Sequence, residues 1–479
     1  MTNQLTNHPT NKPTRRGRTA QIVLALLSLL LACCLCTSLT GNVGTAGWAL
    51  WLHRGLEHER EQTAALESRV QQLQQILLEN DLEIPLAPAD EELMDTIERQ
   101  VEDLRGLQPL RPVERALMTQ EQLRERILQD FEEESSPEEI RDYTLTLAAF
   151  DLLDPDLDVY DLLVRLYTEQ IAGFYDPETE QIYVIADVGS MRQLERLTYA
   201  HEFTHALQDQ HFDLEALGLR DDADEVYDDE YLSAIQALVE GDASLTERRF
   251  MDAYYSADDM ATLVQESLEV DTTVLDSAPA VLREMLMFPY TYGETFVRAL
   301  YEEGGQAAID AAFANPPVST EQILHPERYR SGDMPQIVSL PPLTDTLGTG
   351  WRLVYEEVWG EFSTRYTLSQ QVPAEEAKTA AEGWGGDRYA VYYRESDGAL
   401  VLAWRIVWDT PADAEEFVDA CVTFAEKRFG HAADLSEDAR MCWSGDDHLC
   451  LAWGLADTTI VLGPNATTVE PVIAVIRTP

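Results

Sequence analysis

The stretch Leu194-Glu-Arg-Leu-Thr-Tyr-Ala-His-Glu-Phe-Thr-His-Ala-Leu207 places two histidines, His201 and His205, four positions apart. Its apolar residues recur at helical spacing, so we expect a helix here. Residues four apart lie on one face of a helix, one turn along its axis, so two imidazole nitrogens can reach one Zn²⁺ at about 2.0–2.1 Å. Glu202 would then border the open metal position, where a carboxylate can take a proton from water.

A short β-type segment precedes this helix. Residues 171–186 have the pattern of a strand, a turn at Asp176-Pro-Glu-Thr179, and a second strand. A strand edge beside a metal-binding helix can bind an extended polypeptide by strand addition.

A catalytic zinc site needs a third protein ligand, and the sequence offers two candidates. His211 follows His201 by ten positions, but Gln208 stands where that spacing normally has a glycine. On a continuing helix His211 would lie about 15 Å along the axis from His201. Glu240 belongs to a second helical pattern over residues 231–244, where a carboxylate bordering an apolar stripe is costly to bury unless it binds something. Gly241 would allow a second helix to approach closely.

The runs 200–212 (AHEFTHALQDQHF) and 237–243 (ALVEGDA) resemble gluzincin-type metallopeptidases. More narrowly, they are similar to an uncharacterised bacterial and archaeal membrane-associated group that carries the same two motifs. The resemblance covers about residues 160–410. It implies a mainly helical zincin-like domain with a small sheet, zinc bound by His201, His205 and Glu240, and Glu202 as the general base. Many gluzincins carry an Asp four positions after the ligand Glu, where this chain has Ser244.

Amide hydrolysis places negative charge on the carbonyl oxygen, and a Tyr or His donor commonly stabilises it beside the metal. Two segments could supply that donor. One opens a helix that runs from about residue 285 to 303, and the other is a loop rich in Pro and Thr. We expect Tyr292 from the first and His325 from the second.

The net charge of −53 over 479 residues excludes the basic patches that nucleic-acid binding requires. The N-terminal end has a different character. Residues 1–19 form a basic tail that we expect in the cytoplasm, and residues 20–40 are apolar enough for a transmembrane signal-anchor that exports the rest of the chain. Alternatively, Leu30-Leu-Ala-Cys33 resembles a lipoprotein signal with Cys33 as the lipidated residue.

Residues 55–83 show a short heptad pattern, which predicts a coiled-coil stalk. Its seam over residues 56–77 could join two chains in a homodimer. The alternative is one amphipathic helix folded against the body of the protein.

Two folded regions follow. Residues 89–345 are expected to form the zincin-like domain, and residues 350–479 an α+β module that could be ferredoxin-like. In the module we expect strands at 388–394, 400–408, 440–443, 449–455 and 459–462, and a helix at 412–429. Cys442 and Cys450 flank a turn and could form a disulfide, which would leave Cys421 free and buried.

The sequence therefore predicts an α+β protein that is a membrane-anchored, extracytoplasmic zinc peptidase with a polypeptide substrate. The alternative from another class is a membrane-tethered binding module whose zinc site is structural or vestigial. Glu202 favours the enzyme, because a structural site needs no general base. Aminopeptidase action is a third possibility, which would require an acidic group to hold the substrate amine.

Overall fold

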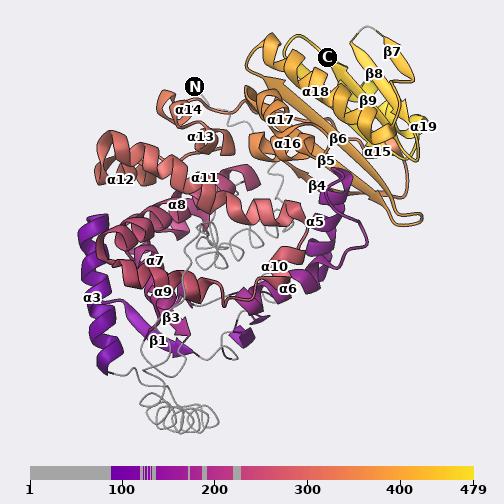
Figure 1. Cartoon of the computed structure of the whole chain (residues 1–479). Helices are drawn as coiled ribbons and strands as arrows, with labels where there is room; N and C mark the ends of the chain where they lie inside the picture. The colour runs from indigo at the N-terminus through magenta and orange to yellow at the C-terminus, as the bar shows by residue number, and fades with distance from the viewer. Residues whose placement is uncertain are drawn as a thin grey trace, which may run out of the picture.

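The computed structural model describes residues 88–478, apart from gaps within 119–135 and at 171–172, 186–190, 220–227 and 438. Figure 1 shows a helical part that carries a small sheet, and a C-terminal module built on a larger sheet. The class is therefore α+β, as expected from the sequence.

The helical part runs to residue 331. Its helices are α3 (Pro88–Arg105), α5 (Pro137–Ala149), α6 (Val159–Gln170), α7 (Gln193–Phe212), α8 (Asp229–Tyr254), α9 (Ala257–Ser267), α10 (Thr273–Ser277), α11 (Ala280–Gly304), α12 (Gln306–Ala314), α13 (Thr320–Leu324) and α14 (Pro326–Ser331), with a π-helical turn at Glu215–Leu219. The small sheet has the order β1-β3-β2, from β1 (Glu114–Met118), β2 (Gly173–Asp176) and β3 (Gln181–Ile185). The predicted strand pair before α7 is thus present as β2 and β3, which pair antiparallel.

Helices α8 and α11 cross at a pair of glycines. A Cβ on Gly241 would lie 2.3 Å from the backbone of Gly293, and a Cβ on Gly293 would lie 2.1 Å from the carbonyl oxygen of Ala237. No side chain fits at this crossing, so the two backbones are in direct contact. The crossing brings the α11 residues around 290 next to Glu240, which precedes Gly241.

The C-terminal module contains one seven-stranded sheet with the order β4-β5-β6-β10-β9-β8-β7. Its elements are α15 (Thr344–Leu347), β4 (Trp351–Glu357), α16 (Gly360–Ser369), α17 (Ala374–Ala381), β5 (Trp384–Arg394), β6 (Ala399–Trp408), α18 (Pro411–Phe429), β7 (Leu435–Glu437), β8 (Arg440–Ser444), β9 (His448–Trp453), β10 (Asp457–Gly463) and α19 (Ala466–Ile476). Alternate residues of the strands pack against α18 on one face and α19 on the other.

The ferredoxin-like expectation is wrong. In that fold another strand lies between the two strands that each helix connects. Here β4 and β5, which α16 and α17 connect, are direct neighbours in the sheet. The five predicted strands and the predicted helix are present as β5, β6, β8, β9, β10 and α18. The strands β4 and β7 and the other helices of the module were not predicted. Cys442 and Cys450 form the expected disulfide, and Cys421 is free and buried.

The predicted fold also included a transmembrane helix, and this part is corrected. Across the described residues, no helix combines the length and the apolar character needed to cross a bilayer. The predicted tail (1–19), membrane span (20–40) and coiled coil (55–83) all lie outside the described residues, as do Cys33 and the seam at 56–77.

The two parts pack together through α5, whose neighbours include β4, β5 and β6 (Figure 1). Phe150, which caps this helix, stacks on Trp359 with 3.8 Å between ring centroids. Arg352 on β4 forms a two-pronged ion pair with Asp142 at 2.6 and 2.8 Å. The junction therefore combines an aromatic contact with an ion pair.

Candidate metal centre

Helices α7 and α8 bring His201, His205 and Glu240 to one point. The Oε2 atom of Glu240 lies 3.2 Å from Nε2 of His201 and 3.4 Å from Nε2 of His205. The three ligand atoms all lie within 4.8 Å of one another. Two ligands of a tetrahedral zinc, bound at about 2.0–2.2 Å, stand about 3.3–3.6 Å apart. The spacing and the donor types thus fit zinc.

All three side chains are buried, with 1% of His201, 6% of Glu240 and 9% of His205 exposed. Such burial is costly for polar groups that bind nothing. The chain supplies a hydrogen-bond acceptor to Nδ1 of each imidazole ring, on the side away from the cluster. Nδ1 of His201 lies 3.0 Å from Oε2 of Glu247, and Nδ1 of His205 lies 2.8 Å from Oε1 of Gln208. Each ring can therefore carry its proton on Nδ1 and turn the Nε2 lone pair toward the cluster.

The partner of His205 is itself held in place. The Gln208 amide donates to the Val239 carbonyl and to Asp242, each at 2.9 Å. Asp242 in turn accepts a 2.8 Å hydrogen bond from Arg105, which is fully buried. Asp242 thus acts on the cluster through Gln208. The sequence suggested no such role, because Asp242 faces a different side of α8 from Glu240.

The cluster attracts positive charge strongly. Burial would raise the pKa of Glu240, but the two imidazoles outweigh burial and lower this pKa to about 2. Burial would lower the pKa of His201, but hydrogen bonds to Glu240 and Glu247 raise it well above its usual value. A divalent cation would supply the same compensation in place of the protons.

Glu202 lies beside the cluster without joining it. It is 3% exposed, and its Oε2 accepts a 2.9 Å hydrogen bond from the Tyr175 amide of β2. Burial raises the pKa of Glu202, although His205 and His201 oppose the shift. A carboxylate with a raised pKa suits a general base. The Tyr175 amide on this strand is already bonded, so in this structure it is not free to pair with an added strand.

Tyr290, rather than Tyr292, is the tyrosine of α11 at the cluster. It is 1% exposed, and its ring centroid lies 6.2 Å from that of His201. Burial and the Glu240 carboxylate raise the pKa of Tyr290 well above its usual value, so the phenol keeps its proton and can donate it. Tyr292 instead packs against Phe288 and Phe362.

His325 and His211 have other partners. Nε2 of His325 lies 2.8 Å from Oε1 of Glu361 in the C-terminal module, and within the described part of the chain no hydrogen bond or ion pair joins His325 to the cluster. Helix α7 continues through Phe212, so His211 stays on the helix, where its Nε2 bonds the Gln108 carbonyl at 2.8 Å. The structure therefore gathers Glu240, and not His211, with the two histidines.

Sequence reasoning missed Tyr290, Glu247 and Gln208. Glu247 had a usable signal, because it follows Glu240 by seven positions and two helical turns place it on the same face. Gln208 follows His205 by three positions on α7, which is also a neighbouring position on a helix. Tyr290 had no such sequence signal, because the choice between Tyr290 and Tyr292 depends on how α8 and α11 cross.

A second group of possible metal ligands occurs in the module, formed by Cys442, His448, Cys450 and Glu470. Both of its sulfurs are used in the disulfide. The cluster of His201, His205 and Glu240 is the one with free donors.

Comparisons with known proteins give little further information. A family model described as "Domain of unknown function (DUF8575)" matches residues 351–473, which is most of the C-terminal module and less than half of the chain. No curated protein matches. One solved structure, a "putative hydrolase with a novel fold" from Chloroflexus aurantiacus, is 15% identical, with 52% of this chain and 93% of that chain covered. Its TM-score is 0.28, so the likeness carries no argument here.

Proposed function

We propose that this protein is a zinc-dependent peptidase. The observation that carries the proposal is the convergence of His201, His205 and Glu240, with the buried carboxylate of Glu202 beside them and outside the ligand set. When bound, zinc would polarise the scissile carbonyl and lower the pKa of a water to about 7.

The residues of the chain then have separate tasks. Glu202 accepts the proton of the attacking water and delivers it to the nitrogen of the leaving amine. The Tyr175 amide holds this carboxylate in position. Glu247 and Gln208 fix the two imidazoles, and Tyr290 offers a protonated phenol to the same space.

The test compares peptide-library cleavage by the full chain with that by the Glu202→Gln variant. We expect one zinc per chain in both proteins, and a cleavage rate about 10²–10⁴-fold lower in the variant, because the general base is lost. Glu302→Gln, which changes an exposed glutamate on α11, is the matched control and should cleave like the wild type.

A zinc-loaded wild type that cleaves no peptide would contradict the proposal. That result would favour the alternative, a binding module with a structural zinc site. Cleavage by Glu202→Gln at the wild-type rate would also contradict the assignment of the base.

A further inference from the structure

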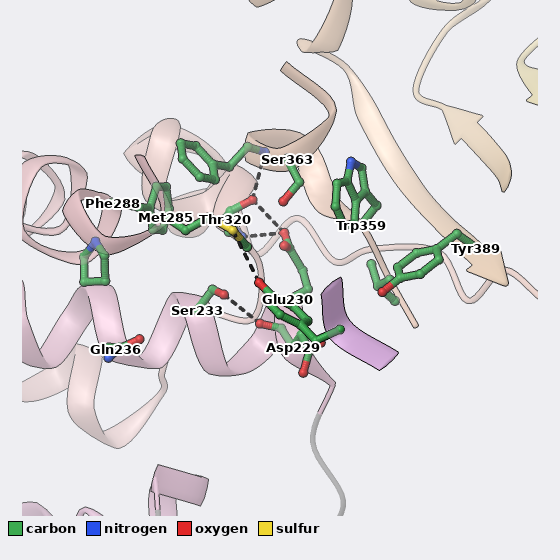
Figure 2. A pocket seen from close by; sticks show the side chains of 14 residues that line it. Asp229, Glu230, Ser233, Gln236, Met285, Phe288, Thr320, Trp359, Ser363 and Tyr389 are labelled. Carbon is green, nitrogen blue, oxygen red and sulfur yellow. Dashed lines mark hydrogen bonds between the residues drawn. The ribbon is translucent and has the colours of Figure 1, made fainter. Parts of the chain in front are cut away.

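A cavity lies at the junction of the two parts of the molecule, between α8 and α11 on one side and α16 and β5 on the other (Figure 2). The space inside it that water-sized molecules can enter is about 40 Å³, which is room for a few waters or a small cationic head group. Gln236 and Pro289 are among the residues that line it. Gln236 precedes Glu240 by one helical turn, and Pro289 is next to Tyr290, so the cavity reaches close to the metal centre along α8 and α11.

Five of the fourteen residues that line the cavity are aromatic. Figure 2 shows Glu230 between Met285 and Phe288 on one side and Trp359 and Tyr389 on the other. The faces of such rings carry negative potential and attract cations. They also suit the methylene stem of a long charged side chain.

Two carboxyl groups from the first turn of α8 stand in this apolar space. Glu230 is 5% exposed, and its Oε1 accepts hydrogen bonds from the amide and the hydroxyl of Thr320 at 2.6 and 2.8 Å. Asp229 receives a long 3.4 Å hydrogen bond from Tyr355 at Oδ2. Its Oδ1 is buried, with no hydrogen-bond partner among the described residues.

None of the described residues that line the cavity is basic. Arg388 lies close enough to oppose the raised pKa of Asp229 in part, but it is paired with Glu356 at 3.3 Å and with Glu357 at 3.6 Å on β4. Buried carboxylates without a counter-charge cost several kcal/mol each if they are ionised. A cation that enters the cavity would therefore stabilise their ionised form.

We infer that this cavity binds the cationic head of a lysine or arginine side chain of the substrate. The assignment to substrate rests on the proposed peptidase function, whereas the cation site itself does not. Burial raises the pKa of Glu230 to about 8 and that of Asp229 well above its usual value, so binding a cation would expel protons from the cavity.

The distance between the cavity and the metal centre predicts how far the basic residue of the substrate lies from the cleaved bond. Glu230 and Glu240 are ten residues apart on α8, which is about 15 Å along the helix axis. An extended peptide advances about 3.3 Å per residue. For a substrate that runs parallel to α8, the basic residue should therefore lie about four to five residues from the cleaved bond.

The first experiment measures binding without cleavage. The fluorescent cation para-aminobenzamidine is titrated into the full chain and into the Glu202→Gln variant, with its neutral isostere para-aminobenzamide in parallel. We expect the cation to bind at least tenfold more tightly than the amide, and Glu230→Gln and Asp229→Asn each to weaken its binding at least tenfold. The amide oxygen introduced by Glu230→Gln can still accept from Thr320, and melting temperatures check that both variants fold.

The matched control is Asp252→Asn, which removes an exposed carboxylate from the same helix and should bind within twofold of the wild type. Equal binding of amidine and amide, or unchanged binding in both cavity variants, would overturn the inference.

The second experiment measures cleavage of peptides in which arginine is exchanged for citrulline at each position in turn. We expect a preference of tenfold or more for arginine about four to five residues from the cleaved bond, and its loss in Glu230→Gln. Cleavage with no such preference would overturn the inference and leave the peptidase proposal standing. Cation binding without any cleavage would do the reverse: it would support the cation pocket and contradict the peptidase.

Discussion

At the scale of single residues, the proposed zinc binding depends on how the imidazole rings of His201 and His205 are oriented. Each ring has an acceptor behind it, Glu247 for His201 and Gln208 for His205. An acceptor on Nδ1 fixes the tautomer and the direction of Nε2, which would otherwise be free to turn. The motif itself was readable from the sequence, but these acceptors are recognised only once both helices are in place.

The Glu247→Gln variant tests this orientation. Removing the negative charge behind His201 should weaken zinc binding about 10–100-fold, because the ring becomes a poorer and less fixed ligand. Competition with a chelator of known affinity gives the dissociation constant, and Glu302→Gln serves as the control. An unchanged constant for Glu247→Gln would show that the carboxylate has no role at the site.

At the scale of elements, the decisive feature is the crossing of α8 and α11 at Gly241 and Gly293. The pattern of apolar residues predicted both helices, and Gly241 suggested a close approach. The partner of that approach was not predictable, because it depends on which face α11 presents after Pro289. For the same reason the sequence favoured Tyr292, whereas the crossing places Tyr290 at the cluster. Five of the module's seven strands were predicted, but their pairing was not, because strand order is a long-range property.

The Gly293→Ala variant tests the crossing. A methyl group there would meet the Ala237 carbonyl, so the helices must separate. We expect a loss of about 1–3 kcal/mol in the free energy of unfolding, with weaker zinc binding, despite the better helix propensity of alanine. Thr291→Ala, at an exposed position of α11, should change neither quantity. A Gly293→Ala protein as stable as the wild type would contradict the close contact.

At the scale of the whole molecule, the junction between the helical part and the module contains buried acids. Burial raises the pKa of Glu230 to about 8 and that of Asp387 to about 6. Asp387 accepts hydrogen bonds from the amides of Trp359 and Gly360 and from two tryptophan rings, so it ties α16 to the sheet. The sequence showed two regions with a boundary near residue 345, but nothing in it indicated that their contact would be acidic.

These raised pKa values predict that stability falls as pH rises. Both carboxyls hold their protons more tightly in the folded than in the unfolded chain, so their contribution is complete below about pH 4.5 and is lost on the way to pH 8. Melting temperatures of chelator-treated wild type should therefore decline between pH 5 and 8. Glu230→Gln should decline less, and Asp252→Asn should follow the wild type. A wild-type curve no steeper than that of Glu230→Gln would refute this account of the junction.

The most direct test of the central claim is the zinc content of the purified, dialysed full chain, measured by mass spectrometry for the wild type, Glu240→Ala and His211→Ala. The structure predicts one zinc per chain in the wild type and in His211→Ala, and loss of the metal in Glu240→Ala. Zinc retained by Glu240→Ala but lost from His211→Ala, or a wild type that binds none, would contradict it.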